Sequence, residues 1–389
     1  MARKGPTTYL FMATQYQEKF PAVFSEYGRD KHLYLTVDDF KSICNKADDA
    51  EHEADLKRVQ KILDDLREIR LKQKSTGGEI RIYGRSLRTS EALTKSIHPK
   101  IRKDNFVEVI GLSGSKQNWK DYPWPRVYIS NNGVMTADDQ KLMNSDLDKK
   151  VLIIMSGGEG RSDEPFYRPI AQFMSRVLQQ EIYVLAVCMS YQVIADQVLC
   201  IGIKRGQHVP PPQEGMFHVG TQVVDLTDLG KRDEVFSELA PAFAVESFNH
   251  YRIYGADLIK DRPAKNIQIL ARDRLTNEVV AYKAGETCWA IQYHPEIKKI
   301  GRAGKGLQHK RSVNIHGKTI IIPKQIHTYQ ETLINILAKN PEWFDRYHMT
   351  ADDLQQFFHP ARRVQNVGDR LTLGILEQAV AAKKRQLGI

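Results

Sequence analysis

Short apolar runs alternate with helical patterns in the middle of the chain. Residues 151–155 and 181–187 are largely apolar, and each run is followed by apolar residues at helical spacing, over residues 165–179 and 189–198. Apolar runs of this length are typical of strands buried on both faces. Further strand-like runs lie at residues 221–226, 267–271, 279–282 and 288–293, and another helical pattern lies at residues 329–337. The pattern predicts an α/β fold with a doubly wound, mostly parallel sheet and helices on both faces.

The two flanking regions carry patterns of their own. Apolar residues at helical spacing over residues 56–69 predict one long amphipathic helix, and a turn at Gly77 and Gly78 separates it from a strand-like segment at residues 79–83. We therefore expect an N-terminal accessory region of unknown function at residues 1–120, an α/β domain at residues 121–339 and a C-terminal extension at residues 340–389. The pattern leaves open whether the extension covers the α/β domain or forms a separate module.

Composition indicates a folded globular protein of the cytoplasm. The chain has 389 residues, of which 41% are hydrophobic and 27% are charged; the hydrophobic content is a little below the globular norm and the charged content is ordinary. No apolar run approaches the length of about 20 residues that a membrane helix requires. The 4 cysteines show no CxxC spacing, which favours a reducing compartment and thiols that stay available for catalysis.

Positive charge is concentrated late in the chain. The net charge is +10, and no acidic residue lies between residues 297 and 330. We regard this stretch as a candidate patch for an anionic ligand such as a nucleotide or nucleic acid. The alternative is a solvated loop that binds nothing in particular. The candidate residues are Lys298, Lys299, Arg302, Lys305, Lys310 and Arg311.

Cys188 lies where an apolar run meets a helical pattern. A thiol attacks as its thiolate, which the N-terminus of a helix stabilises. A tight turn between strand and helix also exposes the sulfur and directs the next backbone N–H, that of Met189, at a developing oxyanion. The alternative is a buried structural cysteine, and this is the role expected of Cys200 and Cys288.

His294, Pro295 and Glu296 follow the apolar run at residues 288–293. The proline restricts the backbone, so that the carboxylate can reach the far nitrogen of the histidine ring and fix its tautomer. A glycine-rich loop at residues 156–160 follows another apolar run but lacks the lysine of a phosphate-binding P-loop. Because active sites collect at the carboxyl ends of parallel strands, we expect this loop, Cys188 and His294 to converge on one edge of the sheet.

Together these motifs resemble the triad glutaminase domain of class I glutamine amidotransferases. The resemblance covers about residues 125–300 and the helical pattern at residues 329–337, with local similarity to the amidotransferase domain of GMP synthetase and to the small subunit of carbamoyl-phosphate synthetase. It implies a flavodoxin-like fold and hydrolysis of the glutamine side-chain amide through a glutamyl thioester. Cys188 would be the nucleophile, His294 the general base and acid, and Glu296 the residue that orients His294.

The same resemblance implies further roles. Gly158 and Gly160, with the Met189 amide, would hold the oxyanion, whereas Gln192 and Asn249 would bind glutamine. It implies no metal and no cofactor, and it sends the ammonia to a synthase partner subunit or another acceptor.

This sequence departs from the family pattern in three places. Ala186 and Ser190 stand where the family has glycines beside its cysteine, the basic residues 298–324 form an insertion after Glu296, and the first strand of the domain is hard to find, with residues 126–130 as the candidate.

Two other functions stay open: a hydrolase of γ-glutamyl amides or peptides with water as the acceptor, and a binding module without catalysis.

Overall fold

Buried side chains alternate between two apolar clusters along the central strands. Leu152 and Ile154 lie in one cluster, whereas Ile153 and Met155 lie in the other, and all four are at most 1% exposed. Since successive residues of a strand point to opposite faces, a strand that is apolar at every position needs cover on both sides. The packing therefore accounts for the continuous apolar run at residues 151–155.

A computed structural model gives the structure of the chain. It describes residues 49–75, 77–85, 87–114, 123–158, 161–200, 218–249, 267–274, 279–295, 310–315, 317–323 and 367–389. The predicted helix at residues 329–337 lies outside the described residues.

The strands of the described part form one large sheet and one small sheet. They are β1 (Ile80–Gly84), β2 (Val107–Ser113), β3 (Arg126–Tyr128), β4 (Leu152–Met155), β5 (Tyr183–Val187), β6 (His218–Leu226), β7 (Ala242–Asn249), β8 (Ile267–Asp273), β9 (Val279–Ala284), β10 (Cys288–Ile291), β11 (Lys310–Ile315) and β12 (Lys318–Pro323). The large sheet has the order β3-β2-β1-β4-β5-β10-β9-β8-β6-β7, and β11 pairs with β12. The first six strands of this order, from β3 at the edge to β10, pair in parallel. The remaining strands, β9, β8, β6 and β7, pair antiparallel.

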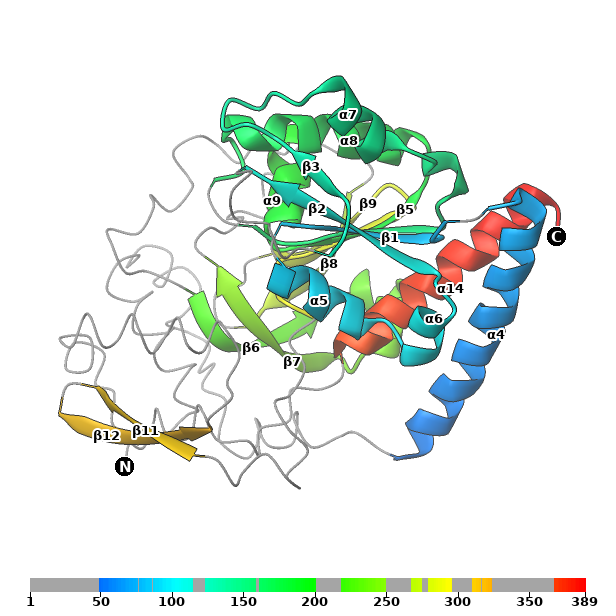
Figure 1. Ribbon diagram of the computed structural model, residues 1–389. Helices are drawn as coiled ribbons and strands as arrows, with labels where there is room; N and C mark the ends of the chain where they lie inside the picture. Colours follow the sequence, from blue (N-terminus) through cyan, green and yellow to red (C-terminus); the bar gives the residue numbers. More distant parts are fainter. Residues whose placement is uncertain are drawn as a thin grey trace.

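Helices cover both faces of the sheet (Figure 1). They are α4 (Asp49–Gln73), α5 (Leu87–Ser96), α6 (Pro99–Lys103), α7 (Ala137–Asn144), α8 (Arg168–Gln179), α9 (Met189–Val193) and α14 (Val367–Leu387), with a π-helical turn, η3 (Ile194–Val198), after α9 and short 3₁₀ turns η1 (Leu147–Lys149), η2 (Pro165–Tyr167), η4 (Gly230–Arg232) and η5 (Phe236–Glu238). Helices α4, α5, α6 and α14 share one apolar cluster, and α7, α8 and α9 share the other. The predicted α/β fold with a doubly wound, mostly parallel sheet is confirmed.

The sheet begins earlier in the sequence than the pattern predicted. Strand β1 lies between β2 and β4 inside the sheet, so residues 80–113 are not an accessory region and the boundary at residue 121 is too late. The predicted first strand at residues 126–130 is instead β3, at the edge of the sheet.

The sequence predicted β1 as a strand-like segment at residues 79–83, but a buried charge conceals its place inside the sheet. Arg81 in the middle of β1 is 2% exposed and lies opposite Glu108 of β2. The two side chains form an ion pair, and Lys150 Nζ lies 2.5 Å from the same carboxylate. Paired in this way, Arg81 can be buried in a sheet interior, although it interrupts the apolar pattern.

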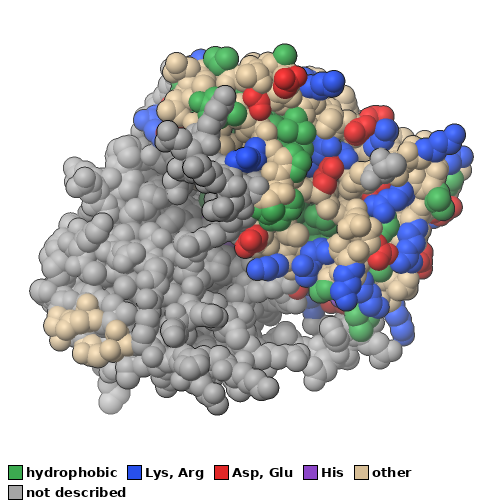
Figure 2. All heavy atoms as spheres, viewed as in Figure 1, with side chains coloured by type: hydrophobic (Ala, Val, Ile, Leu, Met, Phe, Trp, Pro, Cys, Tyr) green, Lys and Arg blue, Asp and Glu red, His purple; other side chains and the backbone are tan. Residues whose placement is uncertain are grey.

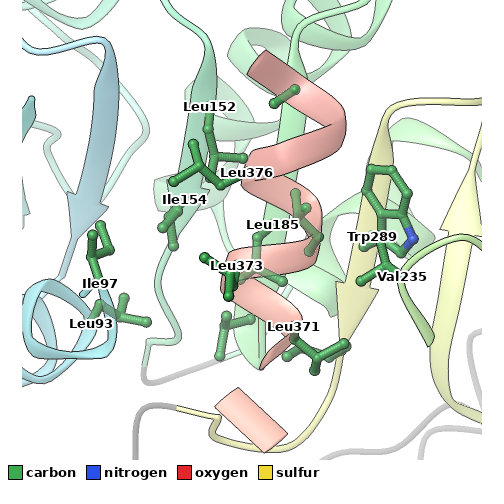
Figure 3. Packing of buried hydrophobic residues seen from close by; sticks show 14 of the residues in the cluster. Leu93, Ile97, Leu152, Ile154, Leu185, Val235, Trp289, Leu371, Leu373 and Leu376 are labelled. Atoms are coloured by element: carbon green, nitrogen blue, oxygen red, sulfur yellow. The ribbon is translucent and has the colours of Figure 1, made fainter. Parts of the chain in front are cut away.

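The last helix packs on the sheet. Leu371 and Leu376 of α14 are at most 1% exposed, and Leu376 lies close to Leu152, Ile154 and Leu185 (Figure 3). The end of the predicted C-terminal extension therefore covers the α/β domain.

Helices α4 and α14 lie side by side (Figure 1). Arg58 of α4 pairs with Glu377 of α14 at 2.5 Å, and Lys384 pairs with Asp65 at 2.7 Å. Basic side chains are interspersed with acidic ones over the described face in Figure 2, in keeping with such pairs. Within the described residues, every helix is too short or too polar to cross a membrane.

Two leucines of α4 test whether this helix belongs to the fold. Leu66 is fully buried, whereas Leu71 is 79% exposed. We expect Leu66→Ala to lower the free energy of unfolding by about 2–5 kcal/mol, because it removes buried methyl groups and leaves a cavity. Leu71→Ala is the matched control and should change it by less than about 0.5 kcal/mol. Urea unfolding followed by circular dichroism measures both, and equal effects would contradict the packing of α4.

Candidate active site

Four neighbouring parallel strands end at one edge of the sheet. Their order is β1-β4-β5-β10, and the segments after their carboxyl ends carry Arg85, Gly157, Cys188 and His294, respectively. The parallel pairing keeps the ends level, since Met155 of β4 lies opposite Ala186 and Ile291 of β10 lies opposite Val187. Residues far apart in the sequence thereby reach one place.

Cys188 occupies a strained turn between β5 and α9. Its φ is +54° and its ψ is −108°, a region that side chains other than glycine rarely adopt. Its N–H donates to the carbonyl of Ile291 (2.8 Å), and its carbonyl accepts from the N–H of Gln192 (3.2 Å). Strain of this kind costs about 1–3 kcal/mol and persists where the surroundings fix the backbone. Here the two bonds hold the cysteine from both sides.

Gly157 brings Cys188 and His294 together. A Cβ atom placed on Gly157 would lie 3.0 Å from Cys188 Cβ, 3.5 Å from its Sγ and 3.4 Å from His294 Cε1. Both side chains therefore face the same small space beside the loop. His294 is 3% exposed and Cys188 is 7% exposed. The arrangement places a thiol next to an imidazole in a site largely closed to water.

Ser156 and Ser190 attach the glycine-rich loop to its neighbours. The N–H of Ser156 donates to the carbonyl of Tyr83 (2.9 Å), and its hydroxyl accepts from the N–H of Arg85 (3.0 Å). Ser190 donates its hydroxyl to the carbonyl of Ser156 (2.6 Å). Ser190, which stands where the family has glycine, thus ties α9 to this loop. Ala186, the other replacement, is fully buried within β5.

Arg85 and two aromatic rings line the loop at Gly158. A Cβ atom on Gly158 would lie 2.7 Å from Tyr167 Oη and 2.8 Å from Arg85 Cδ. Arg85 donates to the Tyr167 hydroxyl, and its guanidinium lies 4.3 Å from the ring centre of Phe166. Burial raises the pKa of Tyr167, with a further contribution from Cys188, although Arg85 lowers it. The tyrosine therefore stays protonated at neutral pH, and Arg85 brings positive charge to this side of the site.

A second amide accompanies Gln192. Gln192 is 5% exposed and donates from Nε2 to Oε1 of Gln292 (3.0 Å), and Nε2 of Gln292 lies 3.7 Å from Cys188 Sγ. The sequence prediction did not include Gln292. The sequence feature that could have indicated it is a polar residue inside the otherwise apolar run at residues 288–293.

The structure describes only some of the other predicted site residues. Met189 is the first residue of α9 and is buried. Asn249 ends β7, the edge strand on the antiparallel side, and its predicted contact with glutamine stays a prediction. Lys310 and Arg311 belong to β11. Gly160, Glu296, Lys298, Lys299, Arg302 and Lys305 lie outside the described residues. No group of three metal-binding side chains occurs within the described part.

The remaining described cysteines differ from each other. Cys288 is fully buried in β10, and burial raises the pKa of its thiol to about 12. It is therefore an inert thiol at neutral pH, as expected of a structural cysteine. Cys200 is exposed, so the prediction that it is buried was wrong. It lies shortly after the π-helical turn η3.

Nearly half of the chain is similar to a known protein family. Residues 130–310 match the family model of class I glutamine amidotransferases, and no curated protein matches. The structure of SMU.1228c is similar with a TM-score of 0.43 and 13% sequence identity, over 77% of this chain and 98% of its own. The glutaminase domain of Trypanosoma brucei CTPS with bound acivicin is similar with a TM-score of 0.39 and 15% identity, over 56% of this chain and 86% of its own. The resemblance to class I glutamine amidotransferases is confirmed over the matched segment, which includes Gly158, Cys188 and His294.

Gly157→Ala tests the close approach of the loop to the site. Its methyl group would lie against both Cys188 and His294, so we expect iodoacetamide to alkylate Cys188 at least about tenfold more slowly, as for other small misplacements in catalytic sites. Peptide mass spectrometry measures the rate. Gly77→Ala is the control, because a Cβ atom there lies at an ordinary 3.7 Å from Glu108 and Lys150. Equal rates in both variants would contradict the described geometry.

Proposed function

Because residues 130–310 match class I glutamine amidotransferases, we propose that this chain hydrolyses the side-chain amide of glutamine and delivers the ammonia to an acceptor. One observation supports this most directly: Cys188, Gly157 and His294 meet at one edge of the sheet, inside the matched segment. A thiol, a base and a glycine-rich loop are the parts that acyl transfer from an amide requires.

The first half of the reaction forms a thioester. His294 takes the proton of the Cys188 thiol, and the sulfur forms a bond with the amide carbon of glutamine. The amide π-bond electrons move to oxygen, and the backbone N–H groups of Gly158 and Met189 stabilise this charge. His294 then passes the proton to the leaving nitrogen, the C–N bond breaks, and ammonia departs.

The second half returns the enzyme to its starting state. His294 takes a proton from water, and the resulting hydroxide attacks the thioester carbon. The C–S bond then breaks, glutamate leaves, and the sulfur regains a proton. Glu296, two residues after His294, orients the imidazole through both halves, as the third member of the triad.

The ammonia acceptor belongs to a partner synthase subunit or to a separate acceptor substrate. The family match supports the glutaminase half-reaction only and ends at residue 310. The same thioester forms in a γ-glutamyl hydrolase, and the difference lies in whether ammonia is used or released. The hydrogen bond from the Ser190 hydroxyl to the Ser156 carbonyl (2.6 Å) supports catalysis over a binding module. Through this bond, the serine in place of a family glycine is accommodated within the site.

A glutamine analogue that carries an electrophile tests the nucleophile. We expect one covalent adduct in the intact mass of the wild-type protein and none in Cys188→Ala, because the analogue reacts with the thiol that glutamine acylates. Cys200→Ala removes an exposed thiol outside the site and should keep the adduct. An adduct that persists in Cys188→Ala would contradict the proposal.

His294→Asn tests the base. This variant should release ammonia from glutamine about 10²–10⁴-fold more slowly than wild type, which is the range that general acid–base catalysis contributes. A coupled glutamate assay measures the rate, with Cys188→Ala as the blank. Activity at the wild-type level would exclude His294 as the base.

A further inference from the structure

We propose that Gln292 is a further catalytic residue, whose side-chain amide donates a hydrogen bond to the Cys188 sulfur and stabilises its thiolate. The inference rests on the proposed function, in which Cys188 is the nucleophile. Nε2 of Gln292 lies 3.7 Å from Sγ of Cys188, so the amide touches the reacting atom itself.

The contact is buried, which increases its effect. Gln292 is 2% exposed and Cys188 is 7% exposed, and hydrogen bonds are electrostatically stronger where water is excluded. A neutral thiol is a weak acceptor. A thiolate carries a full charge, and hydrogen bonds to charged groups are about twice as strong as neutral ones. The amide therefore favours the thiolate over the thiol.

Gln192 fixes which end of the Gln292 amide faces the sulfur. Nε2 of Gln192 donates to Oε1 of Gln292 at 3.0 Å, so the oxygen of Gln292 is engaged and its NH₂ group is turned to Cys188. In the reversed orientation, two NH₂ groups would face each other and a carbonyl oxygen would face the sulfur. Only the first orientation satisfies both contacts, and Gln192 is thus a positioning residue for Gln292.

The backbone closes this arrangement into a ring. The N–H of Gln192 donates to the carbonyl of Cys188 (3.2 Å), and the N–H of Cys188 donates to the carbonyl of Ile291 (2.8 Å), the residue before Gln292. Gln292 itself donates its N–H to the carbonyl of Val280 (2.8 Å). The donor group is therefore held by β5, α9, β10 and β9 together, which leaves it little freedom to turn away.

The hydrogen bond acts at two points of the reaction. When the thiol gives up its proton, it stabilises the charge that forms on the sulfur, and during hydrolysis of the thioester it stabilises the sulfur as it leaves with the electron pair of the C–S bond. A lower basicity speeds the departure of a thiolate but also reduces its nucleophilicity. We therefore expect Gln292 to affect the pH range of the reaction and the second half-reaction more than the binding of glutamine.

The test measures alkylation of Cys188 by iodoacetamide as a function of pH in three full-length variants. Gln292→Met keeps the length of the side chain without a donor, and Gln292→Glu places a carboxylate near the sulfur. We expect the pH of half-maximal alkylation to rise by about one unit or more in Gln292→Met, since hydrogen bonds to charged groups are of this strength, and to rise further in Gln292→Glu. Gln180→Met makes the same change at an exposed position after α8 and should leave it unchanged.

The neighbouring groups stay the same in all variants. Among the described residues, His294 and Tyr167 are titratable neighbours of the sulfur, and Arg85 bonds to Tyr167. A folded Gln292→Met with the wild-type pH profile would overturn the proposal. If Gln292→Met does not fold, Gln192→Met replaces it, because loss of the positioning amide should move the profile in the same direction; an unchanged profile there would also overturn the proposal.

Failure of this inference is distinguishable from failure of the proposed function. Alkylation reads the sulfur without any glutamine. An unchanged pH profile together with Cys188-dependent labelling by the glutamine analogue would remove only the role of Gln292. A protein could show the shifted pH profile yet neither react with the analogue nor hydrolyse glutamine. That result would support the hydrogen bond from Gln292 to Cys188 but contradict a role for it in glutamine hydrolysis.

Discussion

The site depends on the parallel pairing of β4, β5 and β10, because this pairing sets the position of every residue that follows these strands. Ile291 lies opposite Val187, and its carbonyl accepts the N–H of Cys188. A slip of one residue in β10 would turn Gln292 and His294 to the other face of the sheet. The two apolar clusters prevent this slip, since residues of these strands are buried alternately in one and the other. The same strand register therefore determines both the packing of the core and the positions of Cys188, Gln292 and His294.

This constraint also explains how Cys188 keeps an unfavourable conformation. The strain of a positive φ is small beside the free energy gained from two buried faces. The bond that Cys188 donates to the Ile291 carbonyl and the bond that it accepts from the Gln192 N–H fix the turn, and Ser190 attaches the same helix to the glycine-rich loop. A serine in place of glycine gives up conformational freedom but gains a hydrogen bond.

Periodicity predicted the central strands, the helices after them and their common edge, because each strand between two apolar layers is apolar throughout. It also predicted the strand-like segment at residues 79–83, but not its place inside the sheet, since the Arg81–Glu108 pair of β1 and β2 is a tertiary compensation that no local pattern reveals. For the same reason, the sequence indicated the chemistry of Cys188 and His294 but not Gln292 or Arg85. Their relevance arises only from contacts with residues distant in the chain, such as the Cys188–Gln292 contact across 104 positions.

The pairing of α4 with α14 has a consequence for the order in which the chain folds. Arg58 and Glu377 are 319 positions apart, yet they meet across two helices that cover the same face of the sheet. During synthesis, Leu152, Ile154 and Leu185 lack the apolar cover of Leu376 until residues 367–387 have emerged. Contacts of such long range form late and leave apolar surface exposed in the meantime. Completion of the apolar cover of the sheet is thereby coupled to synthesis of α14.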